Sequence, residues 1–230
     1  MILGIETTTQ LLSVALLEGD RLRGAVTIDR PNAHDELLAP LCRDLLRHCG
    51  AVPEDLRAVA VSAGPGSFTG LRIGMAVAKG MALSLHIPLA AVPTPDAVAA
   101  GMVRLLAPAQ DTAAAVFLPA RRGEVYAACY TLRPHCAERN GDIAVLSETE
   151  AAEKIVNGLL IAGDAAEHLL SLPATGAGLL LRQVQADARD VAALGADMIA
   201  DGNAADPASC EPIYIQEFEV RQGKNPLTRP

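Results

Sequence analysis

The sequence predicts an α/β protein of two lobes, in which a unit of order βββαβαβα occurs twice and the second copy is reduced. Half of the 230 residues are apolar but only 3% are aromatic, so Leu, Ala, Val and Ile must fill the core. This composition favours helices packed on a sheet, and the length suffices for two modest cores. Short apolar runs typical of strands alternate with helical patterns in the first half, and the second half echoes that order.

The first half, residues 1–106, predicts a complete unit. Three apolar runs parted by short turns predict an antiparallel meander, and a leucine-rich helix follows them. A buried strand, a glycine-rich turn and a second helix come next, and then one more strand and one more helix. The expected strands are 2–7, 11–17, 21–28, 57–62 and 88–92, and the expected helices are 34–48, 70–85 and 94–106.

The second half, residues 107–230, begins with a polar linker and predicts the shortened copy. Its tail, 221–230, is polar and ends in proline, so we expect it to be loose. The expected strands are 112–118, 124–132, 142–146 and 159–162, and the expected helices are 149–157, 164–171 and 187–201.

A glycine-rich segment, SAGPGSFTGLRIG at 62–74, places a tight turn between a strand and a helix. Ser67 or Thr69 can cap this helix. The backbone N–H groups at such a junction favour an anion or a close partner backbone. A glycine turn also occurs wherever an α/β chain reverses, so the turn alone leaves both interpretations open.

Small residues recur every four positions along the helix that follows the turn. Gly70, Gly74, Ala78 and Ala82 therefore form one smooth stripe. Glycine within a helix costs about 1 kcal/mol relative to alanine, so the stripe indicates that something approaches closely. The approaching element is either the chain's own sheet or a helix of another protein.

Charge, cysteine usage and hydropathy exclude several classes of protein. The net charge is −8 and no basic cluster is longer than Arg121 and Arg122, which disfavours direct nucleic-acid binding and leaves only an indirect role near RNA. Five cysteines without a CxxC pair favour reduced thiols in a cytoplasm. The first residues read as a strand rather than a signal peptide, and no apolar run is long enough to span a membrane.

Five motifs in order resemble the TsaB family, also called YeaZ, over residues 2 to about 214. The duplicated unit is typical of the actin-like ATPase superfamily (ASKHA, RNase H-like), to which this resemblance also leads. The motifs are ILGIETTT at 2–9, NAHDELLAP at 32–40, SAGPGSFTGLRIG at 62–74, IPLAAVPTPDA at 87–97 and RRGEVYAACY at 121–130.

The resemblance implies a non-catalytic partner and activator of TsaD, which transfers a threonylcarbamoyl group onto adenosine 37 of tRNAs that read codons beginning with A. TsaC supplies the activated group. The implied assemblies are a heterodimer with TsaD, a ternary complex with the P-loop ATPase TsaE, and a homodimer when the chain is alone. Contact with tRNA would be indirect.

The implied partner interface lies on two helices of the first lobe. Leucines would supply buried area, the small-residue stripe would permit close helix approach, and Arg72 would make polar contacts at the rim. The expected interface residues are His34, Glu36, Leu37, Leu38, Leu41, Leu45, Thr69, Gly70, Arg72, Ile73, Gly74 and Ala78.

Residue chemistry favours the non-catalytic interpretation. The catalytic relative carries an HxxxH metal-binding pair after the IPL segment, and alignment puts Thr94 and Val98 at those positions. Neither side chain replaces an imidazole, so we expect no metal, no cofactor and no catalytic residue. The rival interpretations are an actin-like small-molecule kinase, a peptidase acting on TsaD, and a self-associating scaffold.

A nucleotide could still lie near the first turn of the chain. Glu6, Thr7 and Thr8 sit where actin-like ATPases place an acidic residue and a phosphate-binding hairpin. The alternative is a strand end with an exposed acid and threonines. The second lobe offers only IAGDAAEHL at 161–169, where Asp164 would repel a phosphate. We therefore expect no ATP hydrolysis by this chain alone.

Two residues of the second lobe depart from the family pattern. Pro119 stands where relatives commonly have aspartate, and Gln216 stands where arginine is expected. Both put in doubt any ligand or ion-pair role carried over to this lobe. Arg121, Arg122 and Glu124 could pair across the lobes or contact a partner, although solvated surface residues would look the same.

Overall fold

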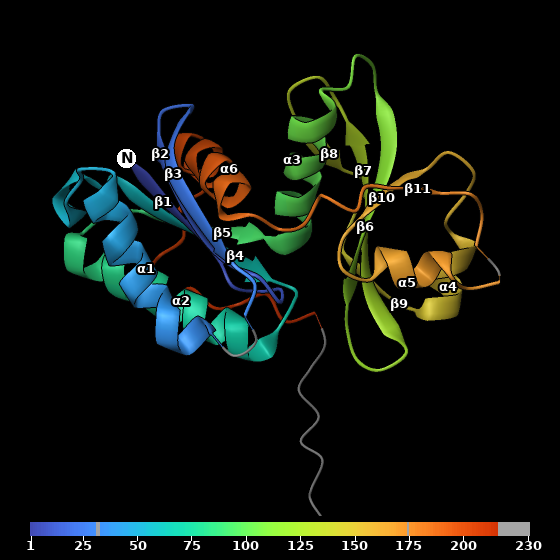
Figure 1. Cartoon of the computed structure of the whole chain (residues 1–230), viewed down its shortest axis with the longest axis horizontal. Coiled ribbons are helices and arrows are strands. Elements are labelled where there is room, and N and C mark those ends of the chain that lie inside the picture. The colour runs from blue at the N-terminus through green and yellow to red at the C-terminus, as the bar shows by residue number, and fades with distance from the viewer. Residues whose placement is uncertain (31–32, 174, 216–230) are drawn as a thin grey trace, which may run out of the picture.

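The computed structural model describes residues 1–30, 33–173 and 175–215, and it shows two lobes that are each built on a mixed sheet (Figure 1). No helix among these residues is long and apolar enough to cross a bilayer. The predicted strands and helices of the first half are all present, with ends that shift by one or two residues.

The first sheet has the strand order β3-β2-β1-β4-β5. β1 pairs antiparallel with β2 and parallel with β4, so the meander is extended by two parallel strands. All of β4 and nearly all of β1 and β2 are buried, as expected where helices cover both faces. The bounds are β1 Ile2–Glu6, β2 Leu12–Glu18, β3 Arg21–Ile28, β4 Ala58–Gly64 and β5 Leu89–Pro93.

Three long helices cover this sheet (Figure 1). α1 (His34–His48) and α2 (Phe68–Leu85) lie on one face, and α6 (Ala188–Ala200) lies on the other. α2 begins two residues before the predicted start, because Ser67 is its N-cap and accepts a hydrogen bond from the backbone N–H of Gly70 at 3.3 Å.

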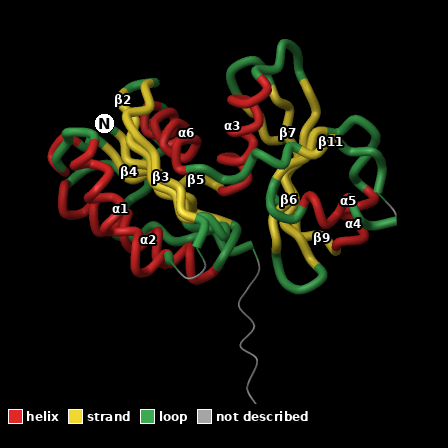
Figure 2. Tube along the Cα trace, in the orientation of Figure 1, coloured by secondary structure: helices red, strands yellow, loops and turns green. Residues whose placement is uncertain are grey.

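The second sheet repeats the order of the first in shortened form (Figure 2). Its order is β11-β10-β6-β7-β8, and β9 also pairs with β7, so β8 and β9 together take the place of β3. This repeat confirms the duplicated actin-like unit. The bounds are β6 Thr112–Pro119, β7 Glu124–Leu132, β8 Ala137–Arg139, β9 Ala144–Ser147, β10 Leu160–Ala162, β11 Leu179–Leu180, α4 Glu148–Glu153 and α5 Ala166–Leu170.

One helix of each unit packs on the other unit's sheet. α3 (Thr94–Leu106) follows β5 in sequence but lies against β6, β7 and β8, whereas α6 lies against β1, β2, β4 and β5. A boundary between residues 106 and 107 therefore follows the sequence repeat but not the packing, because α3 and α6 each pack on the sheet of the other unit. After α6 the chain stays with the first lobe, where the N–H of Ile213 donates to Ala63 O at 2.7 Å. Gln216 and the tail 221–230 lie outside the described residues.

The small-residue stripe of α2 faces the chain's own sheet. A Cβ atom would lie 1.9 Å from Thr7 O at Gly70 and 2.2 Å from Thr7 Oγ1 at Gly74. Ala78 and Ala82 are also buried. Of the two interpretations that the sequence left open, the chain's own strand β1 is the close neighbour. The expectation that a partner's helix approaches Gly70, Gly74 and Ala78 is wrong for this reason.

Candidate functional site

Two further residues expected at the partner interface belong to the core. Leu38 and Leu45 of α1 are 1% and 5% exposed and pack with the β-strands of the first sheet. Their area is already buried within the chain, so we remove them from the candidate interface. The leucines of α1 spread over a wider part of the helix surface than one sheet contact covers, so the sequence alone does not show which of them face the sheet.

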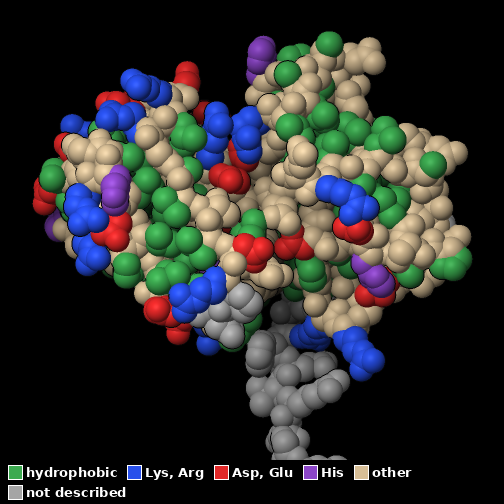
Figure 3. All heavy atoms as spheres, viewed as in Figure 1, with side chains coloured by type: hydrophobic (Ala, Val, Ile, Leu, Met, Phe, Trp, Pro, Cys, Tyr) green, Lys and Arg blue, Asp and Glu red, His purple; other side chains and the backbone are tan. Residues whose placement is uncertain are grey.

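The other expected interface residues leave an accessible face on α1 and α2, which we call the docking face. Leu37, Leu41 and Ile73 are half-buried, with one side on the core and the other toward solvent. The Arg72 guanidinium lies 3.9 Å from the ring centroid of Phe68. Hydrophobic side chains lie among charged ones over the first lobe (Figure 3). The docking face comprises His34, Glu36, Leu37, Leu41, Thr69, Arg72 and Ile73.

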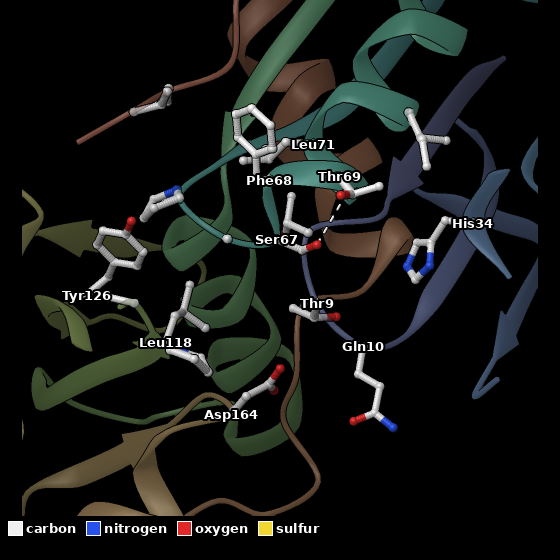
Figure 4. A pocket seen from close by; sticks show the side chains of 18 of the residues that line it. Thr9, Gln10, His34, Ser67, Phe68, Thr69, Leu71, Leu118, Tyr126 and Asp164 are labelled. Atoms are coloured by element: carbon white, nitrogen blue, oxygen red, sulfur yellow. Dashed lines mark hydrogen bonds between the residues drawn. The ribbon is translucent and has the colours of Figure 1, made fainter. Parts of the chain in front are cut away.

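A groove of about 910 Å³ lies between the lobes and adjoins the docking face (Figure 4). The first lobe contributes the turn after β1, from Thr8 to Gln10, and the glycine-rich turn with the start of α2. The second lobe contributes Leu118 to Arg121, Tyr126 and Asp164. His34, Thr69 and Ile73 line this interlobe groove and also belong to the docking face.

The polar residues expected near a nucleotide form an internal network instead. One carboxylate oxygen of buried Glu6 accepts hydrogen bonds from Thr8 N at 2.5 Å and Thr8 Oγ1 at 2.6 Å, and the other accepts from the Ser62 hydroxyl. Thr94 Oγ1 donates to Thr8 Oγ1 at 3.0 Å, and Thr7 Oγ1 donates to a backbone carbonyl. Burial raises the pKa of Glu6 despite these hydrogen bonds.

Glu6 and Thr7 were expected either near a nucleotide or at an exposed strand end, and the structure shows neither. Neither lines the interlobe groove, and neither is an exposed strand end, since both are fully buried. Thr8 does line the groove, although its hydroxyl is engaged by Glu6 and Thr94. The sequence signal that was missed is the pair of hydroxyls on Ser62 and Thr94, which come from β4 and the start of α3.

The two positions aligned with metal-binding histidines are buried. Thr94 is held by its hydrogen bond to Thr8, and Val98 lies in the core of the second lobe. Within the part of the chain that the structure describes, no three His, Cys, Asp or Glu residues are grouped to hold a metal ion.

One polar atom that lines the interlobe groove, His34 Nε2, is buried and has no hydrogen-bond partner among the described residues. Tyr126 is half-buried with Arg121 and Glu124 as charged neighbours, and the Asp164 side chain is exposed at the groove. Partial desolvation raises the pKa of Asp164, and desolvation is also the largest cause that raises the pKa of Tyr126. The sequence identified Asp164 as hostile to phosphate but gave no sign of Tyr126.

The turn that presents Asp164 depends on a glycine. Gly163 has φ +98°, and a Cβ there would lie 2.4 Å from Phe117 O. The carboxylate therefore stands directly beyond β10, where the second lobe faces the first. An acid here disfavours a phosphate by charge repulsion and favours a cation or a hydrogen-bond donor.

Known proteins resemble this chain in sequence and in structure. The family model "TsaD: tRNA N6-adenosine threonylcarbamoyltransferase" matches residues 24–194. The tRNA threonylcarbamoyladenosine biosynthesis protein TsaB of Escherichia coli K12 is 32% identical over 227 residues, which cover 94% of each chain. A tRNA N6-adenosine threonylcarbamoyltransferase of Nitratidesulfovibrio vulgaris is 38% identical over 105 residues, covering 39% of this chain and 29% of that protein.

A solved structure extends the likeness to the whole fold. YeaZ from Pseudomonas aeruginosa superposes with a TM-score of 0.79 at 28% identity, covering 93% of this chain and 99% of that one. The match spans both lobes, as does the full-length similarity to the Escherichia coli protein. The chain belongs to the TsaB (YeaZ) family.

Proposed function

We propose that this chain is the non-catalytic partner and activator of a TsaD-type subunit. The complex would form N6-threonylcarbamoyladenosine at position 37 of tRNAs that read codons beginning with A. The observation that carries the proposal is the docking face, because α1 and α2 keep half-buried apolar side chains and an exposed arginine on their outer side. The printed function of the TsaB relatives supports the same process.

The absence of catalysis in this chain is part of the proposal. Thr94 and Val98 occupy the positions of the metal-binding pair, and neither side chain is an imidazole. The polar groups of Glu6 and Thr8 are hydrogen-bonded to each other and to the hydroxyls of Ser62 and Thr94. Both facts support a chain that positions an enzyme rather than one that performs the transfer.

The same face would serve the other assemblies. In the absence of TsaD a second copy of the chain would cover it and give a homodimer, and the P-loop ATPase TsaE would join the heterodimer. We place these assemblies in the cytoplasm. Contact with tRNA would pass through TsaD, in line with the net charge of −8.

Two substitutions on the docking face test the proposal. Arg72→Glu reverses an exposed charge, and Ile73→Asp places an acid on the apolar surface. Each should prevent co-elution with the TsaD-type subunit of the same organism and reduce tRNA modification at least tenfold in a reaction containing TsaC, TsaD and TsaE. Circular dichroism spectra must match the unaltered chain. Val156→Asp is the matched control, because Val156 is 60% exposed on the second lobe.

The rival functions predict different results for the two variants, for binding of Mg-ATP and for mixing with TsaD. Full modification with Arg72→Glu and Ile73→Asp would contradict docking through this face. Micromolar binding of Mg-ATP to the isolated chain in calorimetry would instead favour the small-molecule kinase. Shortening of TsaD upon mixing would favour the peptidase.

A further inference from the structure

The chain returns to α2 after α6 as a segment without helix or strand, residues 205–214, which we call the strap. At one end Ala205 N donates to Leu89 O at 2.8 Å, on the edge strand of the first sheet. At the other end Ile213 N donates to Ala63 O at 2.7 Å, near the carboxyl end of β4. The strap is therefore fixed to the first lobe at both of its ends.

Side chains of α2 hold the middle of the strap. Lys79 Nζ donates to the carbonyl of Cys210 at 2.8 Å and to that of Ala208 at 3.3 Å. The Sγ atom of Cys210 lies 3.8 Å from Met75 Sδ. These contacts place the strap along the helix that also carries part of the docking face.

The strap ends in a cluster of two aromatic rings and an arginine, which we call the Tyr214 cluster. The ring centroids of Phe68 and Tyr214 are 5.9 Å apart, and the Arg72 guanidinium lies 3.9 Å from the Phe68 centroid. Tyr214 is 46% exposed, Arg72 is exposed and Phe68 is half-buried. These two α2 residues and the two that hold the strap follow the helical repeat, at 68, 72, 75 and 79, so they share one side of α2. The strap thus brings Tyr214 to the docking face, to which Arg72 belongs.

The polar groups of the Tyr214 cluster are hydrogen-bond donors. A guanidinium over an aromatic face keeps its in-plane N–H groups available for a carboxylate, and a tyrosine hydroxyl also donates. Arg72 forms no ion pair with any acidic residue that the structure describes. An acid from outside the chain, next to an apolar side chain that packs on the exposed ring of Tyr214, fits this surface.

A protein is favoured over a nucleic acid as the source of that acid. Phosphate binding needs several cations together, whereas the cluster contributes one arginine. Tyrosine and arginine dominate the binding energy of many protein interfaces, and the cluster is continuous with the half-buried apolar residues of the docking face.

We propose that the Tyr214 cluster receives a segment of the TsaD-type partner that places a carboxylate on Arg72 and an apolar side chain on Tyr214. The proposal rests on the proposed function, because it extends the docking face from α1 and α2 onto the strap. Lys79 is a positioning residue, since it acts through the strap.

Substitutions of Tyr214 measure the contact on the strap. Affinity for the purified TsaD-type subunit is determined by calorimetry, with circular dichroism spectra that match the unaltered chain. Tyr214→Ala should weaken binding at least tenfold, and Tyr214→Phe should weaken it less because the ring remains. Leu179→Ala shortens a side chain that is 56% exposed on the second lobe, and it should bind within twofold of the unaltered chain.

Releasing the strap tests its positioning role. Lys79→Met removes the donor to the two strap carbonyls, so we expect faster amide exchange in the strap and at least threefold weaker binding. Lys154→Met, at an exposed lysine of the second lobe, is the matched control and should change neither. Faster exchange in the strap with unchanged affinity would overturn the proposal.

Salt dependence tests the charge of the partner. Arg72→Gln should weaken binding at least tenfold at low salt and remove much of the loss of affinity that salt causes in the unaltered chain. Arg57→Gln alters another exposed arginine, at the opposite end of β4, and should keep the salt dependence. Equal salt dependence in Arg72→Gln and the unaltered chain would contradict a carboxylate on Arg72.

A photo-crosslinking residue in place of Tyr214 identifies the occupant. The crosslink should fall on a segment of the TsaD-type subunit that contains aspartate or glutamate. A crosslink only within this chain, only to a second copy of it, or only to tRNA in the reconstituted reaction would overturn the proposal.

The two proposals fail in different ways. Unchanged affinity of Tyr214→Ala, together with loss of binding by Ile73→Asp, would overturn the role of the strap and leave the docking face standing. Failure of the unaltered chain to bind the TsaD-type subunit would overturn both.

Discussion

The two lobes share a strand order but differ in the helices on one face of the sheet. In the first lobe this face carries α1 and α2, of 15 and 18 residues. In the second lobe the corresponding helices are α4 and α5, of six and five residues. Both sheets are complete enough to hold a core, so the reduction affects mainly helices. The long helices are therefore the feature that distinguishes a docking lobe from a framework lobe.

The lobes nevertheless depend on each other for closure. α3 and α6 exchange sheets, and they meet through a bidentate ion pair in which Arg104 Nε and Nη2 each lie 2.8 Å from an Asp190 oxygen. Asp190 is 3% exposed. Each lobe thus completes the other's core, and a cut at 106/107 would leave both sheets with one face uncovered.

The largest expected effect is at the contact between α2 and β1 in the first lobe. Gly70→Ala would put a Cβ atom 1.9 Å from Thr7 O, a backbone atom that cannot turn aside. We expect a loss of about 3 kcal/mol or more in the free energy of unfolding, measured by urea denaturation. Complex formation should fail with it, since α2 carries three of the seven residues of the docking face.

Gly80→Ala is the control in the same helix. Nothing lies within 4 Å of a Cβ atom at Gly80, which is exposed. Alanine should therefore stabilise the chain by up to about 1 kcal/mol. If both alanine variants were equally stable, α2 would not be seated against β1 as described.

The second effect tests the link between the lobes. Arg104→Ala leaves the buried Asp190 carboxylate without its partner, and we expect a loss of about 3 kcal/mol in the free energy of unfolding. Arg133→Ala removes the exposed pairs of the second lobe with Asp111 and Glu138 and should cost less than about 1 kcal/mol. Equal losses for the two variants would mean that the α3–α6 pair does not hold the lobes together.

The sequence was sufficient for the fold because long apolar patterns are local. The helices at 34–48 and 94–106 match their predicted ranges, and the duplicated order is confirmed. The strands β8 (Ala137–Arg139) and β11 (Leu179–Leu180) were missed, because a strand of two or three residues carries too few positions for a periodic pattern. The sheet exchange of α3 and α6 was also missed, since an apolar face does not say which sheet it meets.

The candidate site was less predictable, because it depends on contacts between segments that are far apart in the sequence. The stripe that begins at Gly70 showed that something approaches closely, but only coordinates identify Thr7 as the neighbour. Glu6 was expected to face a ligand, and its partner Ser62 lies 56 positions away. Tyr126 enters the interlobe groove because β7 pairs with β6, which is again a contact between distant segments.

The third effect is a pH dependence that belongs to the first lobe. Burial raises the pKa of Glu6 above its ordinary 4.5, so the folded chain holds this proton more tightly than the unfolded chain. The stabilisation is complete below the unfolded pKa and is lost as the pH rises through the folded pKa. Glu6→Gln removes the titrating carboxyl. As the pH rises from the unfolded pKa to the folded pKa of Glu6, the variant should therefore become more stable relative to the unaltered chain.

Urea midpoints measured from pH 4 upward check this expectation. The gain should be about 1.4 kcal/mol for each unit by which the pKa is raised. Other carboxyls contribute equally to both chains and cancel in the difference. Parallel curves for Glu6→Gln and the unaltered chain would show that Glu6 titrates alike in both states.

The smallest expected effect comes from removing the N-cap serine of a short helix, α4, and of a long one, α2. Ser147 caps α4, where its hydroxyl accepts from Glu150 N at 3.2 Å and its N–H donates to the Glu150 carboxylate at 2.9 Å. Ser147→Ala and Ser67→Ala should each cost about 1 kcal/mol. A six-residue helix has little packing to replace its cap, so amide exchange should quicken throughout α4 in Ser147→Ala. In Ser67→Ala only the first turn of α2 should respond, because the sheet holds the rest, and faster exchange along all of α2 would contradict the contrast between the lobes.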